Sequence, residues 1–115
     1  MENLKPGITV GELSELTQAT GKKAAPTSGP IANAKAELTM HGRGAGDDGP
    51  IITSTARSPK QLAVSLKENM VFICKPSAIT EDGNYHCTWG DSVVVTPSGG
   101  RRLGKRRHGL AVSGM

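Results

Sequence analysis

The chain contains 115 residues, the size of one domain, but only 36% of them are hydrophobic and three are aromatic, so its core should be small and largely aliphatic. Its 15 glycines and seven prolines predict short helices and strands joined by many loops. The net charge of +4 comes from residues 101–107, whose five basic side chains leave nine basic and ten acidic side chains, a net of −1, for the rest.

The apolar pattern excludes a transmembrane helix, because no apolar run is long enough to cross a bilayer. The first ten residues lack the basic and apolar regions of a signal peptide. Two cysteines do not define a disulfide framework. We therefore expect an intracellular protein or a virion component, without a membrane partner.

The first predicted element is a short helix over residues 9–20. Thr9 and Glu12 have the spacing of a capping box, and Gly21 stands where a glycine commonly ends a helix. Residues 22–30 contain two prolines and are expected to form an extended arm.

Two strands are predicted next, over residues 35–41 and 51–55, and they could pair as a hairpin. The glycine-rich connector over residues 42–50 matches neither a phosphate-binding loop nor a calcium loop. We interpret it as a flexible partner-contact loop presenting three charged side chains, Arg43, Asp47 and Asp48.

Residues 57–96 contain all three aromatic side chains and both cysteines. Ser58 and Pro59 predict the start of a helix that runs to about residue 69, where leucines and a methionine recur every four residues. Strands are expected over residues 70–74, 85–89 and 92–96. With Cys74 opposite Cys87, the aromatic side chains and cysteines share one face of the sheet.

The cysteines leave three interpretations open. They can be two buried thiols, or a disulfide between Cys74 and Cys87, or zinc ligands together with one or two of His41, His86 and His108. Because no two cysteines have zinc-ligand spacing, we expect no metal and no cofactor. No catalytic motif is present either, so the sequence predicts a protein that is not an enzyme.

The basic tail is the strongest candidate binding site in the sequence. It predicts contact with nucleic acid or with an acidic protein surface. The residues concerned are Arg101, Arg102, Lys105, Arg106 and Arg107.

Together these features predict a β-rich α+β fold: a small single domain with about five short strands, two short helices and extended N- and C-terminal arms. Residues 1–34 form the N-terminal helix and arm, 35–97 the core domain and 98–115 the basic tail. We expect a small non-enzymatic structural subunit of a larger particle, capsid-associated or part of a ribonucleoprotein, with protein partners in multiple copies. The alternative is a nucleic-acid-binding accessory protein that acts through the tail, and an inhibitor or effector of an enzyme stays open.

Overall fold

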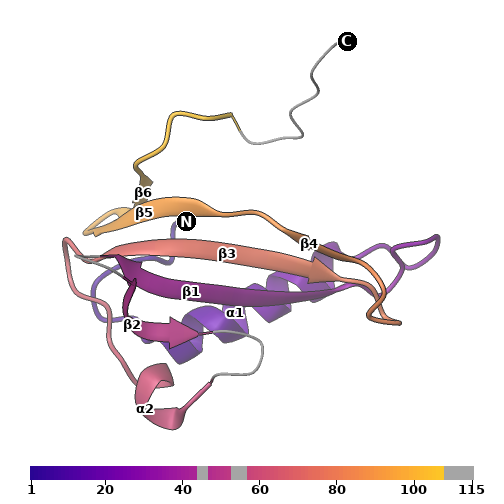
Figure 1. Ribbon diagram of the computed structural model, residues 1–115, viewed down its shortest axis with the longest axis horizontal. Coiled ribbons are helices and arrows are strands. Elements are labelled where there is room, and N and C mark those ends of the chain that lie inside the picture. Colours follow the sequence, from indigo (N-terminus) through magenta and orange to yellow (C-terminus); the bar gives the residue numbers. More distant parts are fainter. Residues whose placement is uncertain (44–46, 53–56, 108–115) are drawn as a thin grey trace.

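The computed structural model describes residues 1–43, 47–52 and 57–107 of the chain. It confirms the predicted α+β class, with a sheet of six strands rather than about five (Figure 1). The elements in chain order are α1 (Val10–Ala24), β1 (Lys35–Arg43), β2 (Asp47–Ile52), α2 (Pro59–Leu62), β3 (Val71–Ile79), β4 (His86–Thr88), β5 (Asp91–Thr96) and β6 (Gly99–Arg102). No helix in the described part of the chain combines the length and apolarity needed to span a membrane.

The strands form one antiparallel sheet in the order β2-β1-β3-β5-β6, with β4 paired to the far end of β3. The predicted pairing of the first two strands is confirmed, but β1 runs on to Arg43 and β2 already begins at Asp47. The predicted loop over residues 42–50 is therefore largely strand. Residues 44–46 and 53–56 lie outside the described part of the chain.

Helix α1 begins at the predicted capping box, in which the Thr9 side chain accepts from the Glu12 backbone and Glu12 reaches back to Thr9. The helix continues past Gly21 to Ala24, so the prediction that Gly21 ends it is wrong. A Cβ at position 21 would lie 2.1 Å from the Cβ of Ala36 on β1. This glycine is therefore explained by the close approach of the helix to the sheet.

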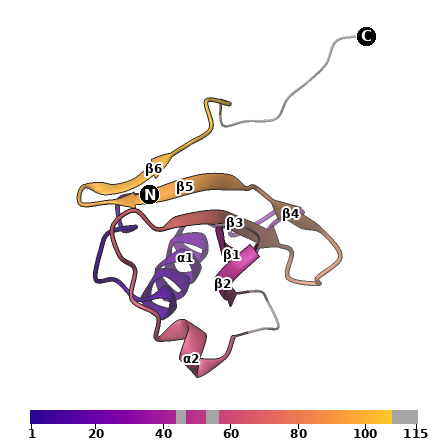
Figure 2. The ribbon, with the colours of Figure 1, turned by 60° about the vertical axis from the view of Figure 1, so that its left-hand side comes forward.

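The core lies between α1 and one face of the sheet, and both helices lie on that side (Figure 2). Its fully buried side chains are mostly aliphatic, as the composition predicted. The largest of them are Phe72, Met40, Ile52, Leu66, Val10, Val93 and Val95.

Helix α2 ends at Leu62, so the prediction of a helix to residue 69 is wrong, although its start at Ser58 and Pro59 is confirmed. The backbone of the following residues pairs with the segment before α1 instead. The Val10 N–H donates to the Val64 carbonyl at 3.0 Å, and the Leu66 N–H donates to the Ile8 carbonyl at 2.8 Å. Leu66 is buried in this extended conformation.

The predicted register between the strands over residues 70–74 and 85–89 is also wrong. Cys74 lies opposite Asp91 instead of Cys87, a shift of four residues (91 minus 87), and Cys87 lies opposite Ala78. Both cysteines are free, so the disulfide that the predicted register allowed is not formed. Phe72 and Cys74 still share one face, as predicted, because they lie two residues apart on the same strand.

The N-terminal segment packs on β6, a strand that lies within the predicted basic tail. The Gly100 N–H donates to the Met1 carbonyl at 2.9 Å, and Leu4 is buried in the core.

Candidate functional site

The sheet has two unlike faces because side chains alternate along each strand. One face packs against α1, and we call the opposite one the open face. The register assigns its side chains mainly to the centre of β1 and β3 and to their neighbours. They are Glu37, Thr39, His41, Ile51, Ile73, Lys75, Ser77, Thr88 and Ser92.

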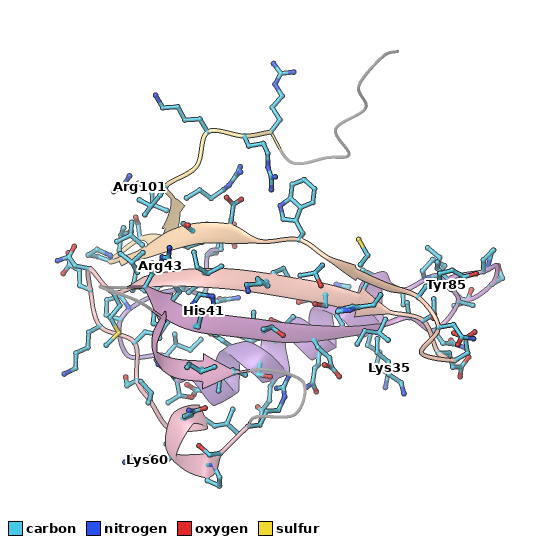
Figure 3. The ribbon with its side chains drawn as sticks, viewed as in Figure 1. Lys35, His41, Arg43, Lys60, Tyr85 and Arg101 are labelled. Atoms are coloured by element: carbon cyan, nitrogen blue, oxygen red, sulfur yellow. The ribbon has the colours of Figure 1, made fainter. Side chains whose placement is uncertain are left out.

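His41 is the central histidine of the open face (Figure 3). It is half-buried, and its backbone pairs with Ile51 on β2 and Ile73 on β3. Its Nδ1 lies 3.0 Å from the carbonyl oxygen of Gly42. Because a carbonyl oxygen can only accept a hydrogen bond, Nδ1 is the donor in this contact.

Lys75 lies on the same face, one diagonal step from His41. It is half-buried, and its backbone pairs with Thr39. A Cβ at position 90 would lie 3.3 Å from the Cγ of Lys75, so the stem of the lysine passes close over Gly90. Among the described residues, no ion pair or hydrogen bond engages the Lys75 ammonium group.

A second group of polar side chains continues the open face toward β4. The hydroxyl oxygens of Ser77 and Thr88 lie 3.0 Å apart, and Thr88 Oγ1 lies 3.0 Å from His86 Nε2. Ser77 is buried, whereas Thr88 and His86 are exposed. This network satisfies a buried hydroxyl and connects β3 to β4.

The face that packs on α1 contains a groove with a volume of about 430 Å³, between α1 and strands β3 and β5. Cys74 and Trp89 line it, together with an ion pair in which Arg102 Nε lies 2.6 Å from Asp91 Oδ2. Burial raises the pKa of the Cys74 thiol to about 11. A thiol with such a high pKa is a poor nucleophile at neutral pH.

The five predicted tail residues do not form one basic cluster. Arg102 pairs with Asp91, and the Arg106 guanidinium lies 4.9 Å from the centre of the Trp89 ring. Arg101 lies on β6 and is exposed, as are Lys105 and Arg107 (Figure 3 labels Arg101). Binding of nucleic acid or an acidic partner by this tail stays a prediction.

The partner-contact residues of the predicted loop also stay a prediction. Arg43 ends β1 and is exposed, and its backbone pairs with Asp47, while Asp48 pairs with Gly42. The zinc interpretation gains no support: Cys74 faces the groove and His41 the open face, and His108 lies outside the described residues.

Residues 1–97 match the model of metallopeptidase family M24, and the chain therefore belongs to this family. A comparison with curated proteins finds no significant match.

This family membership overturns three predictions. M24 is a family of hydrolases, so the prediction that the chain is not an enzyme is wrong, and so are the structural-subunit function and its nucleic-acid-binding alternative. Short motifs with ligand or nucleophile spacing do not reveal this membership, because the match extends over 97 residues and its signal is distributed along the fold. In the sequence, His41 is a candidate only as a partner of the cysteines.

The family description implies a metal ion, and the residues on the open face can be tested for one. Within the described ranges, no three His, Cys, Asp or Glu side chains gather closely enough to hold a metal. On the open face, His41 instead has the positively charged Lys75 as a neighbour. The described residues do not fit a metal centre.

Proposed function

We propose that this chain acts in the hydrolysis of peptide bonds, and that the peptide binds on the open face beside His41. The observation that carries the proposal is the match to a peptidase family over residues 1–97. The half-buried His41, whose Nδ1 is held by the Gly42 carbonyl, supports the choice of face.

His41 is proposed as the general base. Its Nε2 accepts a proton from a water molecule as the water oxygen bonds to the carbonyl carbon of the peptide. When the carbon–nitrogen bond breaks, the same proton passes to the leaving amine, so that a carboxylic acid and an amine are released. The hydrogen bond from Nδ1 to Gly42 fixes the ring and its tautomer through this exchange. No step is assigned to a metal, because the described residues do not fit one.

The proposed setting is intracellular. Both cysteines are free and Cys87 is exposed. Exposed thiols of this kind persist in reducing compartments.

The test is to incubate the full chain with short peptides, alone and with each of Mn²⁺, Co²⁺ and Zn²⁺, and to follow the products by mass spectrometry. We expect hydrolysis, and we expect His41→Ala to lower kcat/KM by about a hundredfold or more. His86→Ala is the matched control, because His86 is an exposed histidine on β4 and should leave the rate little changed. Absence of hydrolysis under every condition, or equal rates for His41→Ala and the wild type, would refute the proposal.

A further inference from the structure

We infer that Lys75 is a substrate anchor, and that it binds the C-terminal carboxylate of a short peptide on the open face. The inference deepens the proposed function and rests on it for the identity of the ligand as a peptide. Its evidence is independent: the burial, neighbours and charge environment of one lysine.

The side chain of Lys75 lies on the open face of the sheet. A half-buried lysine packs its apolar stem against the protein and keeps its ammonium group in water. Lys75 is half-buried, yet no ion pair or hydrogen bond of the described residues engages its ammonium group. Glu37 lies on the same face, one diagonal step away, and forms no ion pair with it. The ammonium group is therefore available to an anion brought by a ligand.

The stem of Lys75 passes over Gly90, which lies in the link between β4 and β5. A Cβ at position 90 would come within 3.3 Å of the lysine Cγ and 4.0 Å of its Cδ. The absence of a side chain at position 90 leaves the stem room to lie against the sheet. A stem held in this way loses less conformational entropy when the ammonium group binds a ligand.

Two hydroxyl side chains would complete the site. Thr39 on β1 pairs with Lys75 on β3, and Ser92 on β5 is a diagonal neighbour of Lys75. Both are half-buried hydroxyls for which no hydrogen bond is formed by the side chain in the described structure. One cation flanked by two hydroxyl donors is well suited to the two oxygens of a carboxylate.

The anchor lies one diagonal step from His41 on the open face. Diagonal neighbours on one face of an antiparallel sheet are roughly 7–8 Å apart, and an extended peptide advances about 3.4 Å per residue. A peptide whose carboxylate binds Lys75 would therefore bring one of its last peptide bonds next to His41. The inferred substrates are short peptides with a free C-terminus.

The experiment measures binding rather than turnover. The isotope-labelled full chain carrying His41→Ala, in which hydrolysis should be slow, is titrated by NMR with trialanine and with trialanine amide, and mass spectrometry verifies that each peptide stays intact. We expect the amide to bind about tenfold more weakly or worse, since it cannot form the charge-assisted hydrogen bonds. In Lys75→Met, which retains the length of the apolar stem, both peptides should bind with the same low affinity.

Lys60→Met is the matched control, because Lys60 is an exposed lysine on α2, away from the open face (Figure 3). It should retain the preference for the free carboxylate, whereas Gly90→Leu should lose it by displacing the lysine stem. Equal affinity for trialanine and its amide in the chain that retains Lys75 would overturn the inference, as would a preference that persists when Lys75→Met is added. An amidated peptide with one aspartate that bound as tightly as trialanine would overturn the assignment to the C-terminus.

These outcomes are separable from those of the proposed function. A carboxylate preference that depends on Lys75, without hydrolysis of any peptide, would refute the proposed function and leave the anchor standing. Hydrolysis that depends on His41, without a carboxylate preference, would refute the anchor alone.

Discussion

The closest packing between helix and sheet predicts a large effect of a single methyl group at Gly21. In Gly21→Ala the new Cβ would lie 2.1 Å from the Cβ of Ala36 and 3.2 Å from its backbone nitrogen and Cα. Carbon atoms in contact prefer about 3.5–4.0 Å, so α1 must move away from β1. Overpacking of this kind costs about 3 kcal/mol, whereas replacing a helical glycine by alanine gains about 1 kcal/mol. We expect the free energy of unfolding to fall by about 2 kcal/mol.

Urea denaturation followed by circular dichroism measures this change, and two further variants test its cause. Ala19→Gly, at an exposed position of the same helix, reports the helix propensity alone and should cost about 1 kcal/mol. The double variant Gly21→Ala with Ala36→Gly removes the closest clash, so we expect a favourable coupling of about 1–2 kcal/mol. If Gly21→Ala stabilises the protein, or if the two substitutions are simply additive, the packing argument is wrong.

Two further predictions concern the groove side of the sheet. Burial raises the pKa of Cys74 from its ordinary value of 9.0 to about 11, so stability that is fully present below pH 9 should decline as the pH rises toward 11. Urea midpoints across that range should decline less in Cys74→Val, while Cys87→Val should behave like the wild type. The contact of Arg106 with Trp89, the single tryptophan, predicts that Arg106→Ala shifts the tryptophan fluorescence. Lys105→Ala should not shift it, and identical spectra for the wild type and both variants would contradict the contact.

The sequence predicted those features that depend on neighbours along the chain. The capping box of Thr9 and Glu12 and the start of α2 at Ser58 and Pro59 are local hydrogen-bonding patterns, and both are formed. The alternating pattern of residues 35–41 likewise placed β1, because a strand with one buried face needs that alternation.

Features that depend on distant segments could not be read from these patterns. A stripe of apolar residues every four positions predicted that Leu66 is helical. Its backbone N–H instead donates a hydrogen bond to the carbonyl of Ile8, in the extended segment before α1. Strand β6 has a glycine- and arginine-rich sequence with low β-propensity, and it forms because β5 and the Met1 carbonyl supply partners for its backbone.

The register error shows why the candidate site was harder to predict than the fold. A shift of four residues keeps each side chain on its predicted face. The face that holds the core was therefore predicted correctly, while each predicted neighbour across the strands over residues 70–74 and 85–89 was wrong. A binding site depends on those neighbours: Lys75 is an anchor candidate only because Gly90 and Thr39 lie beside it. The sequence pattern predicted that the functional residues lie in the tail and in the 42–50 loop. With the observed register, the polar groups converge instead on the face of the sheet opposite α1, and this is where the tests of His41 and Lys75 should be directed.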